Sequence, residues 1–208
     1  MPRPPRPLDA RSAERLRVVA AAAFGAKGLE DASLNEILAT AGMGKGSFYH
    51  RFADKAALHD WVVDGMVERL RAELRVPAPS ALTAASFRAE LDGLLARFMR
   101  AAETDPSLAS LGRMFHNSAD APAERSISRM RAAALHWIDE VLRVGRERGA
   151  IRDDLPAELL SAWAISSLTT LDQWALGADE PTRASVAGTA LDALWSLLAP
   201  PAGGSDGP

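Results

Sequence analysis

Residues 29–58 read LEDASLNEILATAGMGKGSFYHRFADKAAL, a stretch that predicts two helices around a tight turn and the start of a third. Ser33 and Glu36 have the spacing of a capping box, in which the hydroxyl and the carboxylate each accept a bond from a free amide of the first turn. A helix is therefore expected to begin at about Leu34. Its apolar residues recur at helical spacing, and Gly42 supplies the positive backbone angle that ends a helix sharply.

A second, shorter helix is expected from about Lys45 to Arg51, with Phe48 and Phe52 facing inward. Its other side chains are mostly polar and face outward, where they suit phosphate oxygens and base edges: Lys45, Ser47, Tyr49, His50 and Arg51. A short polar helix set against another across a glycine turn is how a recognition helix is presented to the major groove of DNA. A helical hairpin with a solvated charged face is the alternative interpretation of the same spacing.

A third helix is expected to follow directly, and it links the helix-turn-helix to the rest of the chain. Asp54 is placed to cap it, which puts Lys55 in its first turn, where free amides and a cation can meet one phosphate. The apolar spacing continues to about Arg75, where Pro77 and Pro79 stop the helix.

Residues 15–58 resemble the DNA-binding domain of the TetR family of bacterial transcriptional regulators. The matching residues run in register: Ala22, Phe24, Gly28, Ser33, Leu34, Ile37, Ala41, Gly42, Lys45, Gly46, Ser47, Phe48, Tyr49, Phe52, Lys55 and Leu58. The resemblance implies an N-terminal three-helix domain that binds DNA and a C-terminal helical domain for ligand binding and dimerisation. The chain departs from the family pattern at Leu38, where a small Ala is usual, and at Gly44, where Ser or Thr usually caps the recognition helix. We expect Gly44 to be a weaker cap than Ser.

Eight residues are the predicted DNA-binding residues. Five are expected to meet bases and the sugar-phosphate backbone: Lys45, Gly46, Ser47, Tyr49 and His50. Gly46 is included because its missing side chain lets the backbone approach DNA closely. Three more are expected to hold phosphates, namely Ser33, Arg51 and Lys55.

Composition and charge agree with a protein that binds DNA through one end. The chain has 208 residues, of which 48% are hydrophobic and 25% charged, as in a globular protein with a sizeable core. Up to Leu58 there are nine Lys or Arg and six Asp or Glu, whereas 15 and 21 follow, so the basic end is the helix-turn-helix end. With no long apolar run and no apolar N-terminal stretch, the sequence predicts a cytoplasmic protein without a membrane segment.

The residues that begin and end helices along the rest of the chain predict an all-α fold. A first helix is expected from about Ala10 to Lys27, ended by Gly28. After the connector at 76–81, further helices are expected at about 83–104, 107–118, 122–148, 155–176 and 181–198, because no stretch alternates with the period of a strand. We therefore expect an arm and DNA-binding domain at 1–54, an effector and dimerisation domain at 55–199, and a disordered tail at 200–208. The arginines of the arm, Arg3, Arg6 and Arg11, either lie along DNA, enter a minor groove or take no part.

The last two long helices carry more apolar residues than one buried face needs. The resemblance implies that this pair packs against its symmetry mate as a four-helix bundle, which makes the protein a homodimer. Two recognition helices about one turn of DNA apart would read a palindromic operator. The alternative is that these residues fill only the core of their own chain.

Groups for bond-breaking chemistry are scarce in this sequence. It has no cysteine, no metal-ligand spacing among its four histidines and no nucleophile elbow, so we expect neither an enzyme nor a metal or other cofactor. The glycines of GMGKGS at 42–47 have the wrong spacing for a phosphate loop. The resemblance instead implies a small-molecule pocket, for which the candidates are aromatic, soft apolar and histidine side chains: Trp61, Phe98, Met114, His116, Met130, Trp137, Trp163 and Trp174. Taken one residue at a time, each of them is better explained as an ordinary core residue.

The sequence thus predicts a DNA-binding transcriptional regulator, a repressor that an unknown small-molecule effector releases from a palindromic operator. The alternative is a DNA-binding or architectural protein that responds to no ligand, and its signature would be weak sequence preference. An enzyme built on helices is the remote third possibility. The sequence identifies neither the effector nor the operator.

Overall fold

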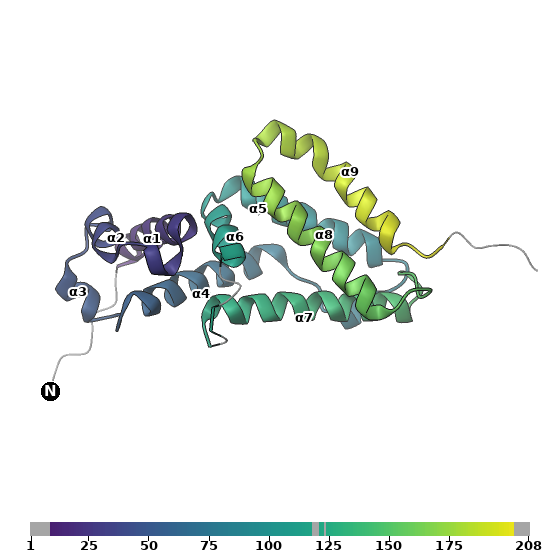
Figure 1. The fold of residues 1–208 in the computed structure, drawn as a ribbon, viewed down its shortest axis with the longest axis horizontal. Helices are drawn as coiled ribbons and strands as arrows, with labels where there is room; N and C mark the ends of the chain where they lie inside the picture. The colour runs from purple at the N-terminus through teal and green to yellow at the C-terminus, as the bar shows by residue number, and fades with distance from the viewer. Residues whose placement is uncertain (1–8, 118–120, 123, 202–208) are drawn as a thin grey trace, which may run out of the picture. The chain divides into compact units, whose positions relative to one another are not determined.

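The structure is a computed structural model, which describes residues 9–117, 121–122 and 124–201. All regular secondary structure in these residues is helical, so the predicted all-α class is confirmed (Figure 1). The α-helices are α1 (Ala10–Asp31), α2 (Leu34–Ala41), α3 (Lys45–Tyr49), α4 (Lys55–Leu74), α5 (Phe87–Thr104), α6 (Ser107–Asn117), α7 (Ser126–Glu147), α8 (Ala157–Gly177) and α9 (Glu180–Leu198). A single 3-10 turn, η1 (Pro79–Ala81), lies in the predicted connector. Arg3, Arg6 and most of the predicted tail lie outside the described residues.

The helix boundaries follow the sequence closely, and the main departures are at α1, α3, α5 and α7. α1 continues past the predicted end to Asp31, but Gly28 breaks its helical geometry with a φ of 74° and a ψ of 175°. α3 ends at Tyr49, two residues before the predicted end. α5 begins at Phe87, four residues later than expected, because Thr83 and Ser86 bond each other's amides in a turn of their own. α7 likewise begins four residues late, at Ser126.

The chain divides into two compact units. The N-terminal unit comprises residues up to Glu73 together with Arg100–Arg131, and the C-terminal unit comprises Leu74–Met99 and the residues from Ala132 onward. The boundaries therefore fall within α5 and α7, and α6 belongs to the same unit as the helix-turn-helix.

One core holds the N-terminal unit together. It is built from buried side chains of α1 to α4, α6 and the start of α7: Leu16, Phe24, Ile37, Leu38, Phe48, Leu58, Val62, Met66, Leu111, Met114 and Ile127. α1 and α6 pack especially closely, because a Cβ added to Gly25 would lie 3.0 Å from the backbone of Ser110. The helix-turn-helix is therefore supported from behind by a helix that lies some seventy residues later in the sequence.

A second core fills the C-terminal unit, where α5, α7, α8 and α9 contribute the buried residues Phe87, Val141, Leu142, Val144, Leu160, Ala164 and Leu198. Gly145 allows Phe87 and Ile151 to approach α7, since an added Cβ would lie 2.6 Å from the Phe87 ring. The indole of Trp195 donates to Asp92 at 2.8 Å, which ties α9 to α5. Among the helices described in either unit, none has the length and apolar character needed to cross a membrane.

Candidate DNA-binding face

The turn between α2 and α3 is fixed at both of its ends by local backbone chemistry. Ser33 Oγ accepts from the Glu36 amide at 3.3 Å, as predicted for the start of α2. The other half of the capping box does not form, because the Glu36 carboxylate pairs with Lys27 Nζ at 3.2 Å. At the far end Gly42 has a φ of 71°, and the amides of Gly42 and Met43 donate to Ala39 and Leu38. These two bonds are those of a Schellman motif, which ends α2 sharply enough for α3 to begin three residues later.

α3 has one buried side and one exposed side. Phe48 is fully buried and its ring lies 5.3 Å from that of Phe52, which confirms the inward direction predicted for both. Tyr49 is 61% exposed, and Lys45, Gly46, Ser47 and His50 are exposed as well. The structure therefore brings together the five residues predicted to meet bases and backbone. Their contact with DNA remains a prediction.

The three predicted phosphate-binding residues have internal roles too. Ser33 is the cap of α2, and its hydroxyl hydrogen is left to donate outward. Lys55 Nζ donates to the carbonyls of Glu30 at 2.7 Å and Ala32 at 3.1 Å, so this cation satisfies the last carbonyls of α1. Arg51 is half-buried, and its Nε has no hydrogen-bond partner among the described residues. A phosphate contact of Lys55 would have to use its third ammonium hydrogen.

α4 begins as the sequence predicts, immediately after the recognition helix. The Asp54 side chain accepts from the Ala57 amide at 2.7 Å, which caps the first turn. One turn further, His59 is buried with its ring 5.0 Å from that of Phe24, and its Nδ1 lies 3.9 Å from Asp60, too far for a hydrogen bond. Burial, reinforced by the Arg125 guanidinium, holds the pKa of His59 below its ordinary value of 6.5. His59 is therefore an uncharged core residue of the DNA-binding end at neutral pH.

Sequence reasoning missed one cation beside the turn. Arg15 of α1 donates from its exposed guanidinium to the Thr40 carbonyl at 2.9 Å, at the C-terminal end of α2. A cation is favourable there because the last carbonyls of a helix carry partial negative charge. The two residues are 25 positions apart, so no local pattern in the sequence indicated this contact.

The predicted pocket residues do not all lie in one unit. Trp61, Met114, His116 and Met130 belong to the N-terminal unit, whereas Phe98, Trp137, Trp163 and Trp174 belong to the C-terminal unit. Trp61 is held between the Phe52 ring at 5.5 Å and the Arg17 guanidinium at 4.6 Å, and so it packs against the helix-turn-helix. The Trp137 indole donates to the Pro77 carbonyl at 2.9 Å. Their role as a ligand pocket stays a prediction.

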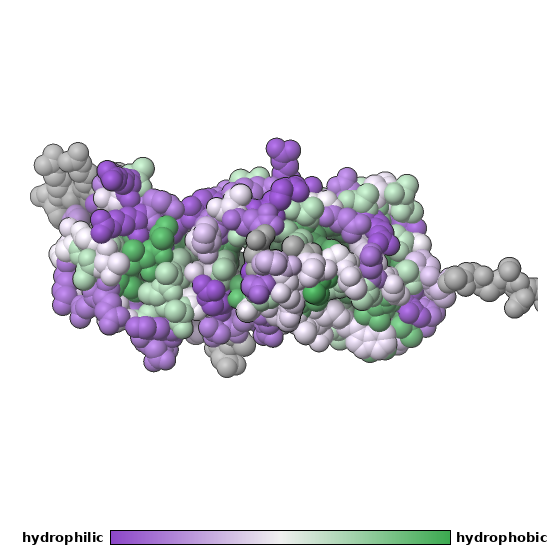
Figure 2. Space-filling model, turned by 90° about the horizontal axis from the view of Figure 1, so that it is seen from above, coloured by the Kyte–Doolittle hydropathy of each residue, from purple (hydrophilic) through white to green (hydrophobic). Residues whose placement is uncertain are grey.

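Large apolar side chains are exposed together on α8. Leu159, Trp163 and Trp174 are 37%, 39% and 38% exposed, and their spacing of four and eleven residues places them along one side of the helix. On the face drawn in Figure 2, hydrophobic residues surface in separate patches among hydrophilic ones. An exposed apolar stripe of this kind marks a surface that another protein surface can cover.

Comparison with known proteins finds a family match for the helix-turn-helix region. Residues 16–60 match the family described as bacterial regulatory proteins, tetR family. No curated protein sequence matches the chain.

Similar folds are found among solved transcriptional regulators. The ketosteroid transcriptional regulator KstR2 of Mycobacterium tuberculosis is 23% identical with a TM-score of 0.69, and the alignment covers 95% of this chain and 99% of that chain. A putative tetR family transcription regulator from Shewanella sp. PV-4 is 18% identical with a TM-score of 0.66, covering 92% and 99%. FadR of Bacillus subtilis, solved in complex with stearoyl-CoA, is 15% identical with a TM-score of 0.63, covering 89% and 98%. Together these matches confirm the predicted fold, a helix-turn-helix domain followed by a helical C-terminal domain.

Proposed function

We propose that this chain, whose residues 16–60 match the tetR family of bacterial regulatory proteins, is a DNA-binding transcriptional regulator, a repressor released from its operator by a small molecule. It binds a palindromic operator as a homodimer, with one α3 in each half-site. The effector binds among the helices that follow α4 and favours the arrangement of the two α3 helices that fits DNA poorly. Such linkage is worth roughly 1–3 kcal/mol in typical allosteric proteins.

The observation that carries the proposal is the two-sided nature of α3. Phe48 and Phe52 anchor the helix from below, and the outer side presents an ammonium, two hydroxyls and an imidazole with a glycine between them. A surface used only for solubility has no need of an exposed tyrosine near a glycine, Gly46, whose backbone is open to close approach. A helix that enters a groove needs both, because a phenol reaches bases or phosphates and the bare backbone approaches closely.

The homodimer is supported by the exposed apolar stripe of Leu159, Trp163 and Trp174 on α8. Tryptophan is enriched among the residues that dominate interface energies. A two-fold axis that pairs this stripe with its copy would also give the two-fold symmetry that a palindrome requires.

A small-molecule effector is supported by what similar proteins bind. FadR of Bacillus subtilis was solved with stearoyl-CoA, and KstR2 is described as a ketosteroid regulator. Both share the fold of this chain over nearly its whole length. The effector of this chain is a separate question, because the residues that line its pocket remain a prediction.

The first experiment is selection of bound sequences from a random DNA pool, followed by affinity measurements on the selected site at several salt concentrations. We expect a palindrome bound at least a thousandfold more tightly than random DNA, the lower end of what specific regulators achieve (about 10³). Lys45→Ala should weaken binding to this site, whereas Lys27→Ala, which removes an exposed lysine paired with Glu36 on α2, serves as the matched control. Recovery of no motif, with equal binding to all sequences, would favour the architectural alternative.

A further inference from the structure

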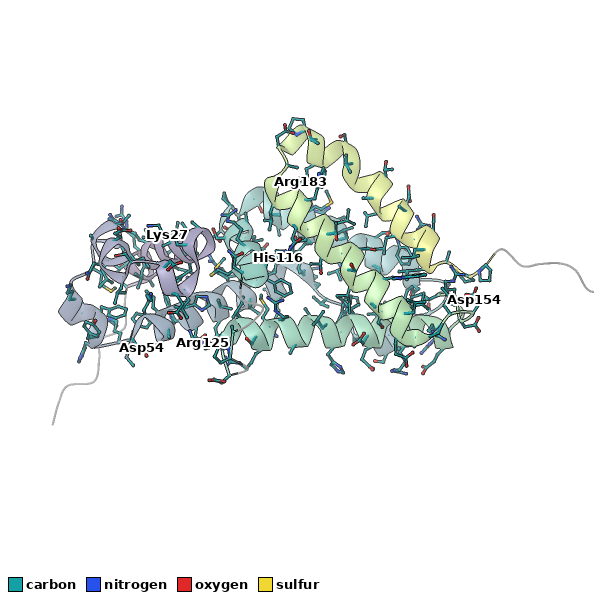
Figure 3. The ribbon with its side chains drawn as sticks, viewed as in Figure 1. Lys27, Asp54, His116, Arg125, Asp154 and Arg183 are labelled. Atoms are coloured by element: carbon teal, nitrogen blue, oxygen red, sulfur yellow. The ribbon has the colours of Figure 1, made fainter. Side chains whose placement is uncertain are left out.

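α4 makes a set of contacts with the beginning of α7 that the DNA-binding role does not need. Ala56, Asp60 and Asp64 lie four residues apart, and therefore on one side of α4. Arg125 Nη2 donates to the Ala56 carbonyl at 2.7 Å, and Arg125 Nη1 lies 3.3 Å from Asp60 Oδ2. The other oxygen of the same carboxylate, Asp60 Oδ1, accepts from the Ser126 amide at 3.0 Å. Arg125 is labelled in Figure 3 where α7 begins, and Asp54 marks the start of α4.

Asp60 acts as the N-terminal cap of a helix to which it does not belong. The Arg125 carbonyl accepts the first bond of α7, from the Arg129 amide at 3.0 Å, so Arg125 occupies the cap position. An arginine side chain has no acceptor with which to cap its own helix, and the first turn of α7 has no acidic residue. The carboxylate of Asp60 supplies both the missing acceptor and the negative charge that a helix N-terminus favours.

The contact is shielded from water, which makes it different from an ordinary surface ion pair. The side chains of Arg125 and Asp60 are 16% and 28% exposed, and Ser126 and Ile127 are buried in the core of the N-terminal unit. The neighbouring pair of Arg129 and Asp64, at 3.8 Å, has exposures of 57% and 61%. Salt and water screen the second pair far more than the first. The sequence separation of 66 residues between Asp60 and Ser126 explains why no motif indicated the contact.

We propose that Asp60 is a coupling residue, which passes the state of α7 to α4 and so to the recognition helix. The proposal rests on the function proposed above and names how it is regulated. α4 begins six residues after α3 ends, and Asp60 lies in its second turn. α7 supplies only its first turns to the N-terminal unit and continues to Glu147. An effector that displaces the start of α7 withdraws the bond to Asp60 and frees α4 to move.

Hydrogen exchange in the full-length dimer tests this inference without a known effector, with the selected operator as the probe. Coupling is reciprocal, so DNA bound at α3 must stabilise the start of α7 by the same factor by which that contact favours DNA binding. We expect saturating operator to slow exchange of the amides at 126–130 by about fivefold or more, the lower limit of typical coupling. In Asp60→Ala this slowing should fall below about twofold, and operator affinity should fall by a similar factor of about five.

Two further variants separate coupling from simple support of the fold. Asp60→Asn keeps one acceptor for the Ser126 amide but loses the ion pair with Arg125, so it should recover part of the DNA-dependent slowing. Asp64→Ala removes the exposed pair on the same side of α4 and should leave the slowing unchanged. If operator slows exchange at 126–130 equally in the wild type and Asp60→Ala, both folded and both saturated, then Asp60 does not couple the two helices.

Failure of the proposed function gives a different result from failure of this inference. If the wild-type protein selects no operator from the random pool, the proposed regulatory function is wrong. The proposed coupling is then wrong as well. A wild-type protein that binds its operator, but shows no change of exchange at 126–130, would keep the regulator and overturn only the role of Asp60.

Discussion

The two units of this protein differ in where their largest apolar side chains are exposed. In the N-terminal unit Phe24, Phe48 and Leu58 are fully buried, and the exposed side of α3 is polar apart from the ring of Tyr49. In the C-terminal unit α8 leaves Leu159, Trp163 and Trp174 partly exposed along one side. The first unit completes its core within one chain. The second carries an apolar surface that one chain leaves open, which is the arrangement expected where a second copy completes it.

The largest effect should come from exchanging a buried residue of α3 for a smaller one. Phe48→Ala leaves a cavity in the N-terminal core, and we expect the free energy of unfolding to fall by about 3–5 kcal/mol. Tyr49→Ala, on the neighbouring exposed position, loses only an edge contact with the Phe48 ring and should lower stability by no more than about 1.5 kcal/mol while weakening operator binding. Urea unfolding and operator titration of both variants provide the measurements. Equal losses of stability in the two variants would contradict the division of α3 into a buried side that supports the fold and an exposed side that binds DNA.

The second prediction concerns the open surface of α8. Trp163→Ala should weaken dimerisation by about 2 kcal/mol or more, roughly a thirtyfold increase in the dissociation constant. Sedimentation equilibrium over a range of concentrations measures this constant. Val18→Ala removes an apolar side chain of similar exposure from α1 and serves as the control. An unchanged dimer in Trp163→Ala would mean that the stripe on α8 is not the interface.

The third prediction separates the structural role of Lys55 from its predicted contact with DNA. Lys55→Met removes the charged donor from the carbonyls of Glu30 and Ala32, and we expect a loss of about 1 kcal/mol in stability because both carbonyls lose this hydrogen-bond donor. Lys45→Ala should lose operator affinity without this loss of stability. A Lys55→Met protein as stable as the wild type, yet defective in DNA binding, would show that Lys55 acts mainly on phosphate.

The residues tested by these predictions also show which features can be predicted from the sequence. The caps at Ser33 and Asp54 and the end at Gly42 were predicted correctly, because each bond joins residues three to five positions apart in the chain. Lys55 was predicted as a phosphate ligand only, since its carbonyl partners lie 25 and 23 residues earlier. A local pattern fixes how a helix begins. It contains no information about which distant helix later supplies a partner.

The same distinction accounts for the C-terminal half. The presence of the C-terminal helices was predicted from apolar spacing and from prolines. The predicted starts of α5 and α7, however, were each four residues too early. At α5 a Thr83–Ser86 turn competes with the helix for the same amides. At α7 the first turn is capped by Asp60 of α4. Burial of the predicted pocket residues likewise depends on helices packed from elsewhere in the chain, so their aromatic character did not reveal their surroundings.

A pH dependence should distinguish the N-terminal core from its surface. Burial and Arg125 lower the pKa of His59 below 6.5, so the folded protein holds fewer protons than the unfolded chain between the two pKa values. Stability should therefore fall as pH drops below about 6.5, where the unfolded chain gains the proton first. Thermal unfolding of the wild type and His59→Gln between about pH 7.5 and about pH 5.5, about one unit on either side of the ordinary histidine pKa, measures this difference. A His59→Gln protein with the same loss of stability on acidification would assign it to other groups.

The smallest effect concerns the weak cap of the recognition helix. Gly44 has the extended backbone of a cap, with a φ of -72° and a ψ of 145°, but no side chain to accept an amide. A Cβ added there meets no other atom within 4 Å, so Gly44→Ser fits and should raise the free energy of unfolding by about 0.3 kcal/mol.

Gly44→Ala is the matched control, because it adds the same Cβ without an acceptor and should lower stability relative to glycine. Opposite signs for the two substitutions, read from urea midpoints, would identify the missing hydroxyl as the cause of the weak cap. Stabilisation by both would instead mean that the glycine acts through the freedom of the unfolded chain. In that event the recognition helix is held by Phe48 and Phe52 alone, and its N-terminal turn depends on the core beneath it rather than on its own cap.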